Sequence, residues 1–168
     1  MNSANQNIVY SQNNRQMING IHMTRDGTGL TNLSYKYDAD GNVSSIVDGL
    51  TPINDKTFGY DAINELTSAK GPWGSTAMTY DNLGNLLTKT VGSATLDYHY
   101  DAQNRLSSVS GSANDAIGYG VYGNVVSINS QKLTYNSAQQ MTADGKYAYI
   151  YDGNNNRSLT TTTSKKPI

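Results

Sequence analysis

The amino-acid sequence predicts an all-β chain made of consecutive antiparallel β-hairpins. Three observations carry this prediction. Tyrosines recur in one register at intervals of 16 to 23 residues. Polar and apolar residues alternate before these tyrosines, and residues that favour tight turns follow them. No segment shows the spacing of apolar residues that is typical of an amphipathic helix.

Seven tyrosines define the repeat. Self-similarity at a regular interval indicates one small structural unit that is stacked many times. Five of the tyrosines are followed directly by aspartate, whereas Gly120 and Asn136 take that place in the fifth and sixth copies. The seven tyrosines are Tyr37, Tyr60, Tyr80, Tyr100, Tyr119, Tyr135 and Tyr151.

The residues before each tyrosine predict a strand with one covered face. Two positions before Tyr80 stands Met78, and the polar Thr79 lies between them. The other copies follow the same order, with an apolar or aromatic residue two positions before the tyrosine. Because side chains on a strand alternate between its two faces, the tyrosine shares the covered face with that residue.

The residues after each tyrosine predict a tight turn. Aspartate favours the first position of a type I turn, and Gly or Asn three residues later can adopt the left-handed conformation that closes a hairpin. Gln139 departs from this preference. The predicted aspartates are Asp38, Asp61, Asp81, Asp101 and Asp152, and the residues that close the turns are Gly41, Asn64, Gly84, Asn104, Gly123 and Asn155.

An apolar residue follows each turn in six of the seven copies, which predicts a return strand on the same face. Arg157 is the exception. We expect three regions: residues 1–32 as an N-terminal cap or degenerate repeat, 33–157 as seven hairpins, and 158–168 as a Thr-rich C-terminal tail. A degenerate copy at 10–17 would place Tyr10 at the repeat tyrosine, with a turn one residue longer.

Charge and composition exclude several classes of function. The net charge of −1 lacks the clustered Lys and Arg of a nucleic-acid-binding surface. The absence of cysteine excludes disulfides and thiolate-bound metal, and no segment is long and apolar enough to span a membrane. The polar, uncharged start is not a signal peptide. We expect secretion or cell-surface display by a route without such a signal, and a cytoplasmic location stays open.

The segments "YDADGNV", "YDNLGNL" and "YDAQNRL" resemble the YD-repeat, or RHS-repeat, family, and the resemblance covers residues 33–157. It implies a curved or spiralling sheet like the hollow shell that encloses a toxic segment in bacterial toxins, or like the related shells of teneurin-like adhesion proteins. The toxin members end in a self-cleaving segment with Asp-Pro motifs, which this sequence lacks. The chain could therefore be a shell fragment, a small separate member, or a subunit that is completed by copies of itself.

Few residues stand out as candidates for chemistry. His99 is the candidate catalytic residue, because a strand histidine near tyrosine could transfer protons in a polysaccharide lyase. "DADGN" at 38–42 is spaced like part of a calcium loop but lacks its sixth-position Gly and twelfth-position Glu. We therefore predict no metal and no cofactor. Side chains that could stack on sugar rings are Trp73, Tyr98, Tyr100 and Tyr122.

The repetition favours a structural role, because seven equivalent catalytic Tyr-Asp pairs would be unusual for an enzyme. We expect a shell or assembly module that encloses, displays or self-associates, without enzymatic activity. Exposed strand edges predict a homo-oligomer or filament, and an enclosed polypeptide or a glycan is the other expected partner. Two alternatives stay open: a carbohydrate-binding module that uses Tyr and Trp, and a polysaccharide lyase or hydrolase that uses His99 with a tyrosine.

Overall fold

The computed structural model describes residues 5–162. Its regular elements are 17 β-strands and one short 3-10 turn, η1 (Pro52–Asn54), and no α-helix occurs among the described residues. Strands that follow one another in the sequence pair antiparallel, up to β13 in one sheet and from β14 onward in a second. The predicted all-β fold of successive hairpins is therefore confirmed. Within this range no helix is long and apolar enough to cross a bilayer.

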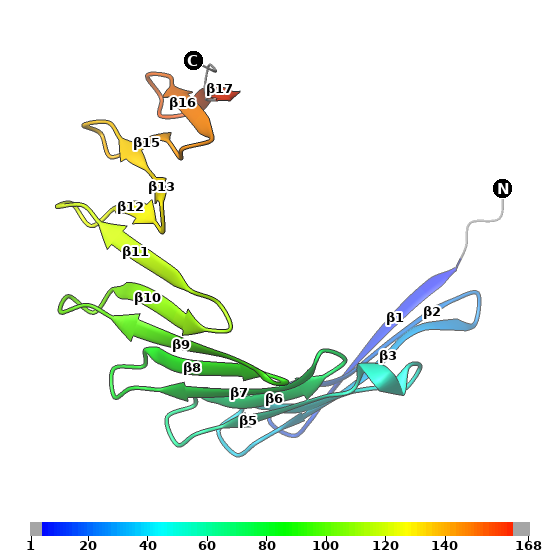
Figure 1. The fold of residues 1–168 in the computed structure, drawn as a ribbon. Coiled ribbons are helices and arrows are strands. Elements are labelled where there is room, and N and C mark those ends of the chain that lie inside the picture. The colour runs from blue at the N-terminus through cyan, green and yellow to red at the C-terminus, as the bar shows by residue number, and fades with distance from the viewer. Residues whose placement is uncertain (1–4, 163–168) are drawn as a thin grey trace. The chain divides into compact units, whose positions relative to one another are not determined.

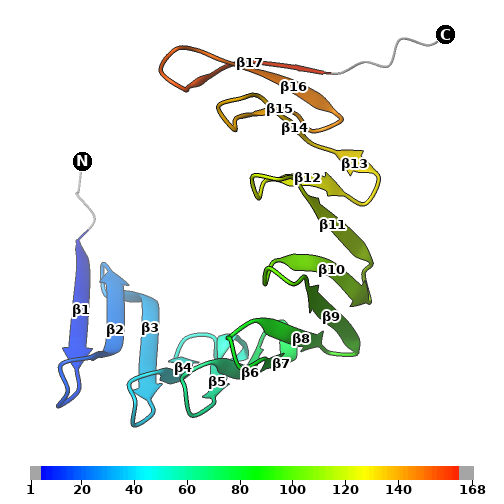
Figure 2. The same cartoon turned by 90° about the vertical axis from the view of Figure 1, so that its left-hand side faces the viewer.

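The chain divides into two units, Met1–Thr95 and Leu96–Ile168. In the first unit each strand pairs with the strands before and after it in the sequence. Figure 2 shows β1, β2 and β3 side by side, and Figure 1 shows the strands that follow them. The strands are β1 (Gln6–Gln12), β2 (Ile18–Arg25), β3 (Thr28–Tyr37), β4 (Val43–Asp48), β5 (Lys56–Tyr60), β6 (Leu66–Gly71), β7 (Gly74–Tyr80) and β8 (Leu86–Val91).

The second unit continues the same pattern with shorter strands. The boundary between the units falls inside β9 (Ala94–Tyr100). Hydrogen-bonded pairing stops after β13, and β14 begins a separate four-stranded sheet. The strands are β10 (Leu106–Gly111), β11 (Asp115–Tyr119), β12 (Val125–Ile128), β13 (Gln131–Lys132), β14 (Thr134–Tyr135), β15 (Met141–Ala143), β16 (Tyr147–Tyr151) and β17 (Arg157–Thr162).

Every repeat hairpin closes through the same bulged turn. The strand register shifts next to the repeat tyrosine, as between Thr79 and Tyr80, and the residue four positions after the tyrosine has a positive φ. This is the geometry of a hairpin closed by a G1-type bulge. Gln139 departs from the sequence preference but not from the conformation, because its φ is 61°.

The first hairpin has this turn as well, in a register that differs from the expected one. Asn13 accepts the two turn hydrogen bonds, Gln16 has the positive φ of 62°, and the register shift lies between Ser11 and Gln12. The repeat-tyrosine position is therefore occupied by Gln12, not Tyr10, and the turn is not longer. The expectation failed because Tyr10 matches the motif by residue type alone.

The described residues form almost no closed core. Among the described residues only Ala69 and Thr76, which face each other on β6 and β7, are buried, with exposed fractions of 8% and 9%. All other described side chains are half-buried or exposed. A sheet normally buries one face against a second layer. Here the stability must come from contacts between adjacent hairpins.

The ends of the chain contribute further hairpin strands. Residues 158–162 of the expected tail lie in β17, which pairs with β16, and residues 163–168 lie outside the described residues. At the other end, β2 and β3 are joined by Asp26 and Gly27, both with positive φ. Such a two-residue Asp-Gly loop matches the right-handed twist of the strands that it joins.

Candidate functional site

The repeat tyrosines connect each hairpin to the one before it. The hydroxyl of Tyr80 donates a hydrogen bond to the carbonyl oxygen of Leu66, at 2.8 Å. Leu66 is the first residue of the preceding return strand, and four further tyrosines bond to the same position of the hairpin before them, at 2.5 to 3.1 Å. These four are Tyr37, Tyr60, Tyr119 and Tyr135.

The repeat aspartates hold the turns. Asp81 Oδ1 accepts the backbone N–H groups of Leu83 and Asn85, and its Oδ2 accepts the side-chain amide of Asn85. These bonds, led by that from the Asn85 side chain, keep the pKa of Asp81 below its ordinary value. The carboxylate is therefore fully ionised at neutral pH and has the wrong protonation state for a general acid.

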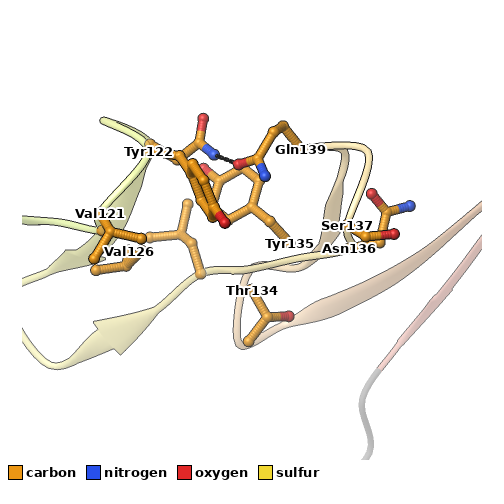
Figure 3. Close-up of a pocket in the computed structure, with 11 residues that line it drawn as sticks. Val121, Tyr122, Val126, Thr134, Tyr135, Asn136, Ser137 and Gln139 are labelled. Carbon is orange, nitrogen blue, oxygen red and sulfur yellow. Dashed lines mark hydrogen bonds between the residues drawn. The ribbon is translucent and has the colours of Figure 1, made fainter.

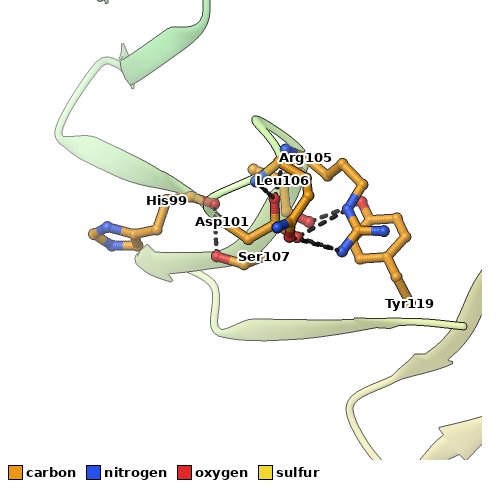
Figure 4. A network of polar contacts seen from close by, with 7 residues as sticks. His99, Asp101, Arg105, Leu106, Ser107 and Tyr119 are labelled. Atoms are coloured by element: carbon orange, nitrogen blue, oxygen red, sulfur yellow. Dashed lines mark hydrogen bonds and ion pairs between the residues drawn. The ribbon is translucent and has the colours of Figure 1, made fainter. Parts of the chain in front are cut away.

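In the fourth repeat arginine takes the place of asparagine. Arg105 donates through Nε to Asp101 Oδ2 at 2.9 Å, and its guanidinium lies over the ring of Tyr119 at 4.3 Å (Figure 4). The side-chain bond from Arg105 is the main reason that the pKa of Asp101 is lowered. Arg105 thereby connects its own turn to the tyrosine of the next hairpin.

In the second repeat the same position is occupied by a second carboxylate. Desolvation raises the pKa of Glu65, and the neighbouring charge of Asp61 raises it further. No group of three or more His, Asp or Glu side chains within residues 5–162 is arranged to hold a metal ion. The "DADGN" segment forms the turn of the first repeat, in which Asp38 accepts backbone N–H groups of Gly41 and Asn42.

A row of side-chain amides links neighbouring turns. Asn42 donates to Asn64 at 2.6 Å, and Gln140 donates to Asn155 at 2.9 Å. Asn124 donates to Gln139 in the same way. Each bond joins the fifth residue after one tyrosine position to the fourth residue after the next. These bonds between turns were not predicted, although Asn and Gln recur at these positions in the sequence.

The candidate catalytic residue His99 lies on the exposed side of β9. Its Nε2 is 2.9 Å from Ser110 Oγ, and its backbone carbonyl accepts a bond from Ser107 Oγ (Figure 4). Among the described residues no carboxylate or tyrosine hydroxyl contacts the imidazole. A nucleophilic or lyase mechanism needs such a third group to orient or assist the base. Within residues 5–162, the side-chain partner of the imidazole is Ser110.

The candidate sugar-stacking residues lie in different environments. Tyr98 and Tyr100 are half-buried strand residues, opposite Val109 and Leu106. Trp73, in the loop between β6 and β7, is half exposed, and its ring folds back over Gly71. Tyr122 is 78% exposed, at the turn between β11 and β12. Of these four, Tyr122 lines a sizeable cavity.

That cavity has a volume of about 530 Å³ and lies between the turns of the fifth and sixth repeats (Figure 3). It coincides with the place where sheet pairing is interrupted between β13 and β14. Its volume falls within the range of roughly 300–1,000 Å³ that is common for small-molecule sites. The lining residues are Gly120, Val121, Tyr122, Asn124, Val126, Leu133, Thr134, Tyr135, Asn136, Ser137 and Gln139.

Comparison with solved structures shows what this fold is similar to. The crystal structure of TcdB2–TccC3 matches 96% of this chain with a TM-score of 0.52 and 19% sequence identity. The Tc holotoxin pore of Photorhabdus luminescens, with a substituted TccC3, also matches 96% of the chain, with a TM-score of 0.46 and 17% identity. The chain spans only 11% and 13% of the lengths of these two structures.

No protein-family model matches the sequence, and no curated protein matches it at a significant level. The likeness to TcdB2–TccC3 concerns the fold alone, because the sequence identity is low. Together with the repeat turns described above, it supports an RHS-repeat or YD-repeat type of fold for this chain.

Proposed function

We propose that this chain is a structural segment of a protein shell, and that it works by edge-to-edge pairing with further copies of its repeat rather than by catalysis. One observation carries the proposal. Five of the seven repeat tyrosines bond to the preceding hairpin, and the repeat aspartates bond to their own turns. Such an arrangement builds a wall and leaves no recurrent group for chemistry.

The edges of the sheets are suited to this role. Among the described residues, β1 pairs only with β2, and β17 pairs only with β16. An edge strand presents a row of backbone N–H and C=O groups that another strand can pair with. β1 has no charged residue and exposes Ile8, Val9 and Tyr10 at 47%, 49% and 60%. It therefore lacks the lysines and prolines that usually block such edges.

The order of strands within a hairpin determines which two edge strands of neighbouring copies would pair. In the first unit, the return strand of each hairpin lies beside the first strand of the next. β17 is a return strand and β1 is a first strand. Pairing β17 of one copy with β1 of another would extend the ladder in the same sense. Because this contact is head-to-tail, it generates a ring or an open filament.

Sedimentation velocity over a concentration series, with negative-stain electron microscopy, tests the proposal. We expect rings or filaments whose size distribution shifts upward with concentration. Val9→Lys should shift the distribution to monomers, because a charge on an edge strand opposes pairing. The matched control is Ile150→Lys, at a 56% exposed position of β16, which is paired on both sides. A monomer at all concentrations, or equal effects of the two substitutions, would contradict the proposal.

A further inference from the structure

The cavity lies between the turns of the fifth and sixth repeats. Among the described repeats, this is the one pair of neighbouring turns in which neither has the repeat aspartate. In the fifth repeat Gly120 replaces the aspartate, so this turn has no carboxylate. A Cβ atom on Gly120 would lie 3.0 Å from Cγ1 of Val126, one of the lining side chains. A side chain at position 120 would therefore require Val126 to shift. Glycine leaves Val126 in place and keeps this turn uncharged.

Two unused hydrogen-bonding groups lie side by side on the cavity wall. The amide of Asn124 donates to Gln139 Oε1. Among the described residues no group bonds to Asn124 Oδ1 or to Gln139 Nε2. Since each amide has both donor and acceptor capacity, the pair offers one acceptor and one donor to a ligand. Two adjacent hydroxyl groups, each able to donate and accept, would match this pair.

The cavity also has an aromatic rim. Tyr122 lines the cavity together with Val121 and Val126 (Figure 3), and this tyrosine is 78% exposed. An exposed tyrosine ring gives a flat apolar surface with a hydroxyl at its edge. The inner wall is fixed by Tyr135, whose hydroxyl bonds to the carbonyl of Val125 at 2.9 Å. The rim is thus free to contact a ligand while the wall is anchored.

The absence of charge among the lining residues selects the class of ligand. None of the eleven residues that line the cavity is Asp, Glu, Lys or Arg. A phosphate or carboxylate ligand would lose its hydration on entering the cavity. Because no cationic side chain lines the site, this desolvation would be costly in free energy. A neutral saccharide has hydroxyls for the amide pair and an apolar ring face for the tyrosine. We propose that this cavity binds one or two rings of a neutral saccharide.

Ligand-observed saturation-transfer NMR with the full chain tests this proposal. The probes are lactose, cellotetraose, chitotetraose and mannotriose, with tetragalacturonate as the anionic counterpart. We expect saturation transfer to at least one neutral probe and none to tetragalacturonate. In a ¹⁵N-labelled protein, the same probe should shift the amide resonances of Tyr122, Asn124 and Gln139.

Two variants separate binding from folding. Tyr122→Ala removes the stacking surface, and we expect about a tenfold loss of affinity. Its control is Leu83→Ala, at the same turn position of the third repeat and 75% exposed. Gln139→Gly removes the amide but favours the turn, because Gln139 has a positive φ. Its control is Asn64→Gly. This substitution removes the side-chain amide at the same turn position of the second repeat, which accepts a hydrogen bond from Asn42.

The outcomes are distinct from those of the assembly experiment. Loss of binding in Tyr122→Ala and Gln139→Gly, with binding kept in both controls, supports the saccharide site whatever the oligomeric state. Absence of saturation transfer from all neutral probes overturns it. Binding that survives both cavity variants, shifts that centre on Trp73, or stronger binding of tetragalacturonate would also overturn it.

Discussion

At the scale of single residues, the Tyr-Asp pair has two separate tasks. The tyrosine acts between hairpins, because its hydroxyl reaches the first carbonyl of the preceding return strand. The aspartate acts within one hairpin, because its carboxylate accepts the N–H groups of its own turn. The two residues are adjacent in the sequence because the bulge at this point sends one side chain to the neighbour and the other into the turn.

Tyr80→Phe tests the first task. The substitution keeps the ring but leaves the carbonyl of Leu66 without its 2.8 Å partner. We expect a loss of about 0.5–1.5 kcal/mol in the free energy of unfolding, measured by urea denaturation. The control is Tyr10→Phe, since Tyr10 is 60% exposed and its hydroxyl has no partner among residues 5–162. Equal losses in the two variants would remove the proposed role of the hydroxyl.

At the scale of the hairpin, the residue four positions after the aspartate adjusts each turn. Asn85 and Arg105 donate to the aspartates of their own turns. Glu65, the sole glutamate in the sequence, instead places a second carboxylate beside Asp61. The pKa of Glu65 is raised, whereas that of Asp61 is lowered, mainly by the backbone N–H of Glu65. The second turn is therefore the one whose stability should respond to pH in an unusual direction.

Glu65→Gln should stabilise the protein at neutral pH. A raised pKa means that the folded state binds the proton of Glu65 more tightly than the unfolded state does. The contribution of Glu65 to stability is therefore fully present below its unfolded value of 4.5 and is lost as the pH rises through the folded value. Glutamine removes this loss and supplies an amide donor for Asp61, as Asn85 does for Asp81.

Thermal unfolding of both proteins between pH 3.5 and 7.5 measures this effect. We expect the midpoint of Glu65→Gln to exceed that of the original chain at pH 7.5, with the difference vanishing near pH 3.5. Asp40→Asn is the control, because it makes the same charge change at an exposed turn residue whose carboxylate has no described partner. A difference that grows as the pH falls would contradict the assignment.

The hairpins could be predicted from the sequence because their determinants are local. Tyr80, Asp81 and Gly84 lie within five residues of one another, and turn preferences act over this range. Gln12 at the tyrosine position escaped prediction, since its repeat is recognisable only from the backbone turn. The cavity could not be predicted from the sequence for a different reason. Asn124 and Gln139 meet only when two hairpins are side by side, although Tyr122 could be selected as an exposed aromatic.

At the scale of the whole molecule, the stabilising contacts join successive hairpins and do not form a common hydrophobic core. Only two described residues are buried, and the bonds between hairpins join neighbours. Proteins of this kind behave approximately as a sum of repeat stabilities and nearest-neighbour contacts. A local defect should therefore loosen its own hairpin and the adjacent ones, while distant hairpins keep their protection.

Gly84→Ala provides such a defect. Gly84 has a φ of +81°, which costs an L-residue roughly 1–2 kcal/mol. Hydrogen-exchange mass spectrometry should show faster exchange in residues 56–111, which comprise this hairpin and its two neighbours, and unchanged exchange in 147–162. The control is Gly153→Ala, at a glycine without a positive φ and with no atom within 4 Å of an added Cβ. Uniform acceleration along the whole chain would show that unfolding is all-or-none instead.

The order of the strands also has a mechanical consequence. In both units each strand is hydrogen-bonded only to its neighbours in the sequence, and the strands of each pair are antiparallel. A force that pulls the two chain ends apart therefore loads one hairpin at a time and peels it open from its free end. A released hairpin of about 20 residues would lengthen the chain by up to about 70 Å. Under load the molecule would therefore extend in successive steps, each at a low unfolding force. It would not resist up to one large force and then unfold at once.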